Sequence, residues 1–317
     1  MQKSSKSRWP AALTGDSRVA LIAASGPVRG EADVAIAESH VQGFGWEPVR
    51  GQFVLGQHGY LAGTDAERLA DLQWALDDPT IDAVWCVRGG YGLTRILPSL
   101  SLAAFAARPK AIVGFSDVTA LHCAVAARTG IVTFHAPSAR SALPPMSAGS
   151  LRACLEGDGE ACGIWPGAVQ VRGGRVTGRL AGGNLALLAA LSGTPDALRS
   201  DGAIVVLEDV NESEYRIDRM LRQLEQAGDL HGCAGLTVGQ FTAVPPDENR
   251  GAMSIDALVA ELAERLRVPC LSNLPFGHIA DQWTLPLGAS AMLDVDSRSL
   301  RVENDRHMFS ITRGATP

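Results

Sequence analysis

The stretch AIVGFSDVTALH (residues 111–122) changes its hydrophobic pattern within a few positions. It begins as a short apolar run, which is typical of an inner strand of a parallel sheet. Apolar residues then recur at helical spacing at Val118, Leu121 and Val125, so a helix begins within about two residues of Ser116. The pattern predicts a strand that turns directly into a helix, with Ser116 at the corner.

A serine at such a corner faces the unpaired N–H groups of the new helix. In one interpretation its side-chain oxygen caps the helix and has no other role. In the other, its hydroxyl is a nucleophile, because the same N–H groups can stabilise the oxyanion that forms during acyl transfer. This stretch alone favours the cap for Ser116.

Strand and helix signals alternate through the first half of the chain. This alternation predicts an α/β fold with a doubly wound parallel sheet. Ligand sites in such sheets gather at the carboxyl ends of the strands, where Ser116 lies. Thr64 and Glu67 have the spacing of a capping box at the start of one helix. The predicted strands are 18–25, 82–89, 110–116 and 131–136, and the predicted helices are 31–44 and 64–78.

Residues 137–170 are rich in Pro, Ser, Gly and Ala, so we place a domain boundary in this segment. Beyond it, the pattern predicts strands at 203–209 and 235–241 and helices at 213–228 and 254–269, followed by short strands with Gly and Pro turns. Ser254 is the expected N-cap of the last helix. The expected division is an N-terminal extension (1–16), a nucleophile domain (17–140), a linker (141–170) and a C-terminal domain (171–317).

The composition of the 317 residues is that of an ordinary globular protein, with 46% hydrophobic residues and a net charge of −6. This charge gives no electrostatic reason to expect a nucleic acid or an anionic membrane as partner. No apolar run reaches the roughly 18 residues of a membrane helix. The stretch WPAALTGDS (9–17) is too short and polar for a signal-peptide core, so we expect a cytoplasmic protein. Six scattered cysteines without a C-x-x-C pair favour buried free thiols.

A nucleophilic serine needs a base, and that base needs a group to orient it. His122 lies six residues after Ser116 and points elsewhere on the helix. His135 follows an apolar strand and can lie beside Ser116, while His278 lies in a Gly/Pro loop. Their positions do not choose between His135 and His278.

Glu208 directly follows five apolar residues at the end of a predicted strand. A carboxylate there is half-buried and costs stability unless it has a partner. A histidine that it orients would be that partner. In a second interpretation, Glu208, Asp209 and a histidine hold a divalent metal ion. Because no compact ligand motif is present, we rank the metal below the triad and expect neither metal nor cofactor.

Two glycine-rich turns also follow predicted strands. CVRGGYG (86–92) does not match the G-x-G-x-x-G fingerprint, so it does not predict a dinucleotide site. It is either a tight turn or, because glycine lets backbone N–H groups approach a ligand, half of an oxyanion hole. AGGN (181–184) precedes a helix and either binds substrate or is simply a turn.

Seven short motifs occur in one order through both halves of the chain. They are VRGGYG (87–92), GFSD (114–117), GGNLALLAALSGTP (182–195), LEDVNE (207–212), YRIDRML (215–221), FGH (276–278) and TLPLG (284–288). Together they resemble the LD-carboxypeptidase family of serine peptidases, which also contains the microcin-immunity peptidases. The resemblance covers about residues 18–303 and implies an N-terminal sheet like that of class I amidotransferases, with a smaller β-rich C-terminal domain.

The resemblance implies a catalytic triad of Ser116, Glu208 and His278, and this reverses the preference for a helix cap at Ser116. It also implies an oxyanion hole formed by the backbone N–H groups of Gly90 and Asp117. The sequence GFSDV lacks the second glycine of the G-x-S-x-G elbow, which argues against an ordinary α/β-hydrolase.

The residues expected to contact substrate are Gly89, Gly183 and Asn184. Arg88 is a candidate for binding a substrate carboxylate, although a structural ion pair is favoured for it.

Members of the family cleave the L,D bond that releases the terminal D-alanine of murein tetrapeptide during cell-wall recycling. The resemblance therefore implies a cytoplasmic serine carboxypeptidase that needs no cofactor, forms a homodimer and has a peptide as its partner. One alternative is an immunity-type peptidase that cleaves a peptidyl-nucleotide toxin. A more distant alternative is a non-catalytic amidotransferase-like binding module, which would leave Glu208 without a role.

Overall fold

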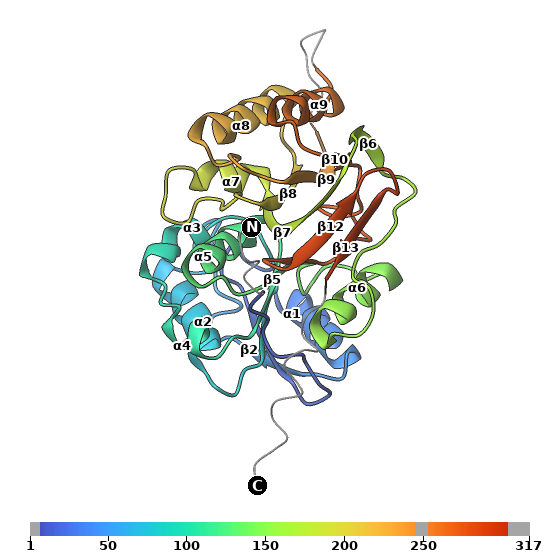
Figure 1. Cartoon of the computed structure of the whole chain (residues 1–317). Helices are drawn as coiled ribbons and strands as arrows, with labels where there is room; N and C mark the ends of the chain where they lie inside the picture. The colour runs from blue at the N-terminus through green and yellow to red at the C-terminus, as the bar shows by residue number, and fades with distance from the viewer. Residues whose placement is uncertain (1–6, 245–252, 304–317) are drawn as a thin grey trace.

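The computed structural model describes residues 7–244 and 253–303 (Figure 1). Parts of the expected N-terminal extension and C-terminal domain, namely residues 1–6, 245–252 and 304–317, lie outside the described residues. Among the described residues, no helix combines the length and apolar character that crossing a bilayer requires.

The first sheet has six strands in the order β11-β5-β4-β3-β1-β2. Five of them pair in parallel, as the alternation of strand and helix predicts. Residues of β3 and β4 are buried throughout, which explains their continuous apolar runs. The parallel strands are β1 (Arg18–Ile22), β2 (Glu47–Arg50), β3 (Ala83–Cys86), β4 (Ala111–Gly114) and β5 (Thr133–His135).

Helices cover both faces of this sheet, so the prediction of a doubly wound fold is confirmed. Side chains that alternate along each strand enter two separate cores. One core contains α2 and α5, and the other contains α1 and α6. Thr64 and Glu67 form the predicted capping box of α2. The helices are α1 (Glu31–Gly43), α2 (Asp65–Asp77), α3 (Leu93–Ile96), α4 (Ala103–Ala107) and α5 (Thr119–Thr129), with a 3₁₀ turn η1 (Leu97–Ser99) after α3.

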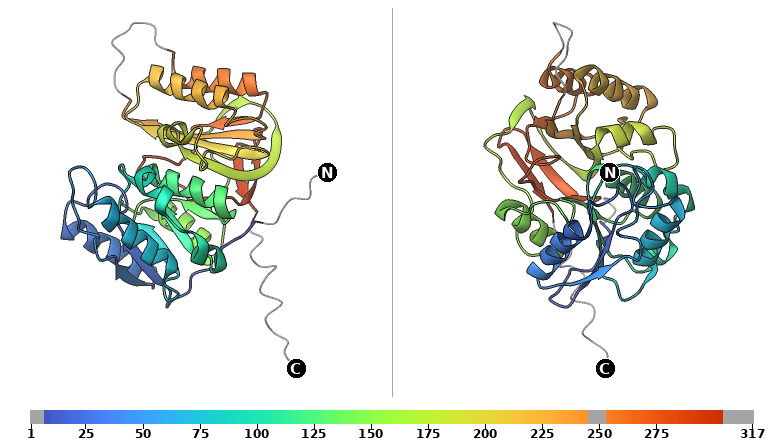
Figure 2. Two further views of the ribbon diagram at one scale, coloured as in Figure 1. Left: turned by 90° about the vertical axis from the view of Figure 1, so that its left-hand side faces the viewer. Right: turned by 180° about the vertical axis from the view of Figure 1, so that it is seen from behind.

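The second sheet has seven strands in the order β13-β12-β7-β8-β9-β10-β6. Strands β7 to β10 are parallel and the outer ones antiparallel. Helices α8 and α9 cover the side of this sheet remote from the first domain (Figure 2). The elements are β6 (Val169–Arg172), β7 (Arg175–Asn184), α7 (Leu185–Leu191), β8 (Ala203–Val210), α8 (Glu214–Ala227), β9 (Gly235–Thr242), α9 (Ile255–Leu266), β10 (Cys270–Ser272), β12 (Ser290–Asp294) and β13 (Ser299–Val302).

The segment 141–170, expected as a linker, contains the helix α6 (Pro145–Glu156). Its composition is typical of a loop, yet Pro145 lies in the first helical turn, where its missing N–H is not needed. Leu151, Cys154 and Leu155 then lie on one face and pack into the core of the first sheet. The structure therefore has a packed helix at Pro145–Glu156, where the sequence predicted a linker.

A strand from the second half of the sequence completes the sheet of the first half. β11 (Leu285–Leu287) comes from the second half of the sequence but pairs antiparallel with β5 of the first sheet, Leu285 opposite His135. The buried core that contains α2 and α5 also continues into α7 and α8. The halves therefore share their interior rather than meeting only at the surface.

An ion pair adds to this connection. Arg128, near the end of α5, contacts Asp196 through two hydrogen bonds of 2.8 and 2.5 Å. The Asp196 side chain is only 8% exposed. A buried carboxylate that loses its partner is costly, because it has already given up its hydration.

We expect Arg128→Met to lower the free energy of unfolding by about 2 kcal/mol, because Asp196 would remain buried without its cation. The measurement is urea denaturation at neutral pH. The control is Arg108→Met, since Arg108 pairs with Asp82 at the surface and should change the same quantity by about 0.5 kcal/mol or less. Equal effects of the two substitutions would contradict the prediction.

Candidate active site

Ser116 lies at the corner that its sequence predicts. β4 ends at Gly114, and one 3₁₀ turn, η2 (Ser116–Val118), leads into α5. Ser116 has a φ of 63°, a left-handed conformation that is rare for residues other than glycine and that clusters at functional sites. In the described part of the chain, no side-chain hydrogen bond caps either helical segment. The interpretation of Ser116 as a helix cap is therefore wrong.

Glu208 and His278 are in direct contact. The Oε2 atom of Glu208 lies 2.7 Å from Nδ1 of His278. The Glu208 side chain is fully buried, whereas 19% of the His278 side chain is exposed. Gly277 makes this approach possible, because a Cβ atom there would lie 3.0 Å from the same carboxylate oxygen. The structure thus gives Glu208 the histidine partner that its position at a strand end predicts.

The ring of Phe115, the residue before Ser116, packs against His278. The centroids of the two rings lie 4.6 Å apart. With Nδ1 facing the carboxylate, Nε2 is the nitrogen that remains to accept a proton. Among the described residues the Ser116 hydroxyl has no hydrogen bond, and contacts of this type often tighten only when substrate is bound.

The glycine turn after β3 lies against the serine. A Cβ atom on Gly89 would lie 2.8 Å from Cβ of Ser116, so only glycine fits there. Gly90 has a φ of 122° and packs on Gly26. In the described residues its N–H donates to no other backbone group. Asp117 lies in the first helical turn, where N–H groups lack a partner within the helix. Both N–H groups are therefore available to a ligand.

The buried carboxylate of Asp117 links three segments around the serine. Its Oδ2 atom accepts hydrogen bonds from the Ser25 hydroxyl at 2.6 Å and from the Leu93 N–H at 2.9 Å. Burial raises the pKa of this carboxyl group. The side chain thereby fixes the turn after β1 and the turn after β3 relative to Ser116. The sequence analysis considered only the backbone of Asp117 and missed this role and that of Ser25.

Gly183 and Asn184 lie where the second sheet touches α5. A Cβ atom on Gly183 would lie 2.6 Å from the Thr119 hydroxyl. The Asn184 side chain is buried, donates to Asp209 at 2.9 Å and accepts from the Leu187 N–H, which caps α7. This geometry favours a structural role for Asn184, since both ends of its amide are occupied within the protein.

His122 and His135 are both buried, and both lie beside Gly114 at the end of β4. Burial lowers the pKa of His122 to about 4 and that of His135 to about 3. His122 contacts the Gly114 carbonyl, whereas neither ring nitrogen of His135 has a hydrogen-bond partner among the described residues. Glu208 therefore pairs with His278 and not with His135, which resolves a choice that the sequence pattern left open.

Asp209 does not join Glu208 in a cluster of metal ligands. Its carboxylate accepts from Asn184 and from the Ala186 N–H at 2.8 Å, and burial raises its pKa to about 6. Within residues 7–244 and 253–303, no group of three or more His, Cys, Asp or Glu side chains is arranged to hold a metal ion. The six cysteines are free and buried.

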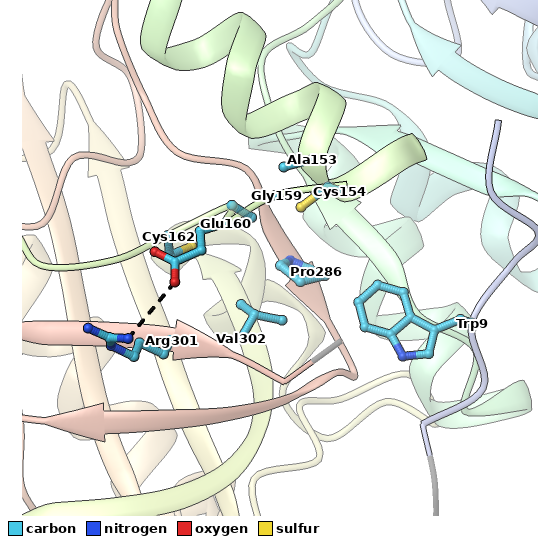
Figure 3. A pocket seen from close by; sticks show the side chains of 10 residues that line it. Trp9, Ala153, Cys154, Gly159, Glu160, Cys162, Pro286, Arg301 and Val302 are labelled. Carbon is cyan, nitrogen blue, oxygen red and sulfur yellow. Dashed lines mark ion pairs between the residues drawn. The ribbon is translucent and has the colours of Figure 1, made fainter. Parts of the chain in front are cut away.

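Two cavities lie away from these residues. A small one of about 60 Å³ is lined by Trp9, Cys154 and Pro286, with Glu160 and Arg301 paired at 3.9 Å beside it (Figure 3). A groove of about 920 Å³ lies between α5 and β7. None of Ser116, Glu208 and His278 lines either cavity.

The chain is similar to known proteins over both halves. Residues 19–136 match the family model described as the LD-carboxypeptidase N-terminal domain, and residues 177–293 match the C-terminal domain. The murein tetrapeptide carboxypeptidase of Pseudomonas aeruginosa is 37% identical over 298 residues, which cover 88% of this chain and 94% of that protein.

Two solved structures have the same fold. The muramoyltetrapeptide carboxypeptidase of Oxalobacter formigenes has a TM-score of 0.80 at 30% identity and covers 90% of this chain and 98% of its own. The microcin C7 self-immunity protein MccF has a TM-score of 0.83 at 22% identity, with coverage of 92% and 97%. The second likeness concerns the fold alone.

We expect the stability difference between the protein and its His135→Leu variant to depend on pH. The folded pKa of about 3 lies below the unfolded value of about 6.5. Below pH 6.5 the unfolded chain therefore binds a proton that the folded chain does not, and His135 costs about 1.4 kcal/mol more for each unit that the pH falls.

Urea denaturation of both proteins between pH 7 and pH 4.5 measures this difference. The variant should gain stability relative to the parent as the pH falls. Val113→Ala, a buried substitution on the neighbouring strand without a titrating group, should differ from the parent by the same amount at each pH. A constant difference for His135→Leu would count against the buried neutral histidine.

Proposed function

Because the chain belongs to the LD-carboxypeptidase family, we propose that it is a serine carboxypeptidase of cell-wall recycling. It hydrolyses the L,D bond of murein tetrapeptide and releases the terminal D-alanine. The observation that carries this proposal is the 2.7 Å contact between Glu208 and His278, together with the packing of His278 on Phe115, the residue that precedes Ser116 in the chain. A nucleophile, a base and a group that orients the base are the parts that acyl transfer requires.

In the proposed reaction, Nε2 of His278 takes the proton of the Ser116 hydroxyl as its oxygen attacks the scissile carbonyl. Glu208 holds the imidazole through Nδ1–H and stabilises the imidazolium that forms. The tetrahedral intermediate collapses, and His278 gives its proton to the leaving amine of D-alanine. Water then attacks the acyl-enzyme by the same route and frees Ser116. Every proton in this sequence moves through side chains of the chain itself.

The N–H groups of Gly90 and Asp117 are the proposed oxyanion hole. Among the described residues neither N–H has a backbone partner, and the Asp117 carboxylate ties its own turn to the turn after β3 that carries Gly90. Donors that are fixed before the reaction stabilise the developing charge at no cost of reorganisation. Gly89 and Gly183 remain proposed substrate contacts, because each lies against the corner that bears Ser116.

The names of the relatives favour murein peptide as the substrate. Two proteins that are at least 30% identical to this chain over most of its length carry names of tetrapeptide carboxypeptidases, and a third is named a probable murein peptide carboxypeptidase. MccF shares the fold at lower identity, so cleavage of a peptidyl-nucleotide toxin is kept as an outcome of the test. We also propose a cytoplasmic homodimer, in which residues 17–140 form the nucleophile domain and residues 171–317 carry Glu208 and His278.

The purified protein should convert murein tetrapeptide into tripeptide and free D-alanine. The isomer that ends in L-alanine should be cleaved at least about a hundredfold more slowly, because an inverted residue displaces the reacting carbonyl from a fixed nucleophile. Mass spectrometry of both reactions is the measurement. Equal rates would indicate a general carboxypeptidase. Cleavage of neither isomer would reject the murein substrate and would favour the toxin peptide.

Ser116→Ala and His278→Ala should each lower kcat/KM on the tetrapeptide by several powers of ten, because members of a triad act as a unit. Both variants should keep the circular dichroism spectrum of the parent. Glu47→Gln, which changes an exposed carboxylate on β2, is the control and should keep full activity. Normal turnover by Ser116→Ala would remove the proposed nucleophile.

A further inference from the structure

We propose that Arg88 binds the free C-terminal carboxylate of the peptide substrate, with Arg29 and Arg140 adding positive charge around it. This inference rests on the proposed carboxypeptidase function, because only a substrate with a free terminus needs such a site. It assigns the residue that makes the protein cleave the last peptide bond and no other.

The topology brings three arginines to the edge of the sheet that carries Ser116. Arg29 follows β1, Arg88 follows β3 and Arg140 follows β5. These strands and β4, which Ser116 follows, are parallel neighbours in the first sheet. Side chains after the carboxyl ends of adjacent parallel strands meet at one edge. The three arginines therefore lie at the same edge of the sheet as Ser116, and Arg29 and Arg140 are near enough to Arg88 to act on its charge.

Arg88 adjoins the glycine turn of the proposed oxyanion hole. It directly precedes Gly89, which lies against Ser116, and Gly90. Its guanidinium carbon lies 3.7 Å from the position that a Cβ atom on Gly26 would occupy, and a Cβ atom on Gly90 would lie 3.0 Å from the Cα atom of Gly26. The terminal carboxylate of the substrate lies within one residue of the scissile carbonyl. The guanidinium of Arg88, beside the glycine turn, is therefore within reach of that carboxylate.

The guanidinium of Arg88 is oriented but has no anion. Its Nη1 atom donates to the Pro27 carbonyl at 2.5 Å. In the part of the chain that the structure describes, Arg88 forms no ion pair, so the structural ion pair favoured by its sequence is not observed. Its Nε and Nη2 atoms are left without a protein acceptor there. A planar guanidinium with one side fixed can offer its remaining donors to a carboxylate in a bidentate manner.

The surrounding charge favours an incoming anion. Asp33 is the acid in this cluster, and it already pairs with Arg140 at 3.3 Å and accepts from the Arg29 backbone N–H at 2.9 Å. Burial and the positive charges of Arg140 and Arg29 lower the pKa of Arg88. Three cations that share one carboxylate repel one another, and a bound substrate carboxylate would relieve this repulsion.

Other arginines near the site are already engaged. Arg68 is fully buried and donates to the Ala24 carbonyl and to Asp65. Arg95 forms three hydrogen bonds with the same Asp65 carboxylate, at 2.9, 3.1 and 2.7 Å. Neither has the combination of position and unsatisfied charge that Arg88 has.

The test compares murein tetrapeptide with the same peptide ending in D-alanine amide, using the parent protein and Arg88→Gln. The parent should strongly prefer the free acid. Arg88→Gln should lose about 10- to 100-fold in kcat/KM on the acid, the range for a lost hydrogen bond to a charged group. Its kcat/KM on the amide should stay within about twofold, so the preference for the acid disappears.

Two further variants separate recognition from folding. Arg88→Lys keeps the charge without the bidentate fork and should lose part of the acid preference, which keeps the test informative if Arg88→Gln does not fold. Arg95→Gln, beside the same loop but paired with Asp65, should leave the acid-to-amide ratio unchanged.

The outcomes distinguish the two proposals. If Arg88→Gln keeps the parent's preference for the acid, or loses activity equally on acid and amide, Arg88 does not bind the carboxylate, and the carboxypeptidase function stands. If the parent cleaves acid and amide equally, carboxylate recognition is absent altogether. If the parent cleaves neither peptide, the proposed function fails and the role of Arg88 fails with it.

Discussion

The site depends on the close approach of the second sheet to the start of α5. Gly183 lies against Thr119, and the N–H of Asn184 donates to the Thr119 hydroxyl at 3.0 Å. Thr119 follows Ser116 by less than one helical turn, and Glu208 lies opposite Asn184 in the neighbouring strand. This contact therefore fixes the distance between a serine from one half and a carboxylate from the other. A side chain at position 183 would force the two halves apart.

The elements that the sequence predicted well are those whose signals are local. The capping box of Thr64 and Glu67 and the N-cap at Ser254 formed as expected, because each needs only a few neighbouring residues. The strand before Ser116 was equally readable from its apolar run. The position of Glu208 also predicted a partner, since burial of an unpaired carboxylate at a strand end is costly.

What the sequence could not reveal depends on residues that are distant in the chain. The sequence pattern did not distinguish His135 from His278. Only the folded chain shows that His278 contacts Glu208, whereas His135 packs edge-on against Phe115. The helix α6 was hidden by a loop-like composition, because its apolar face is defined by the core against which it packs. The short strand β2 is partly exposed and lacks an apolar run, so it gave no signal. The side-chain role of Asp117 required knowing that the turns after β1 and β3 lie next to it.

The pairing of β11 with β5 has a consequence for how the protein is made. The first five strands of the first sheet are complete by residue 135, but the strand that covers their edge begins only at Leu285. The ribosome must therefore synthesise about 150 further residues while the backbone groups on the outer edge of β5 remain unpaired. Nascent chains with an open sheet edge are prone to pair with one another. The order of the strands thus exposes the newly made chain to aggregation until Leu285–Leu287 have been synthesised.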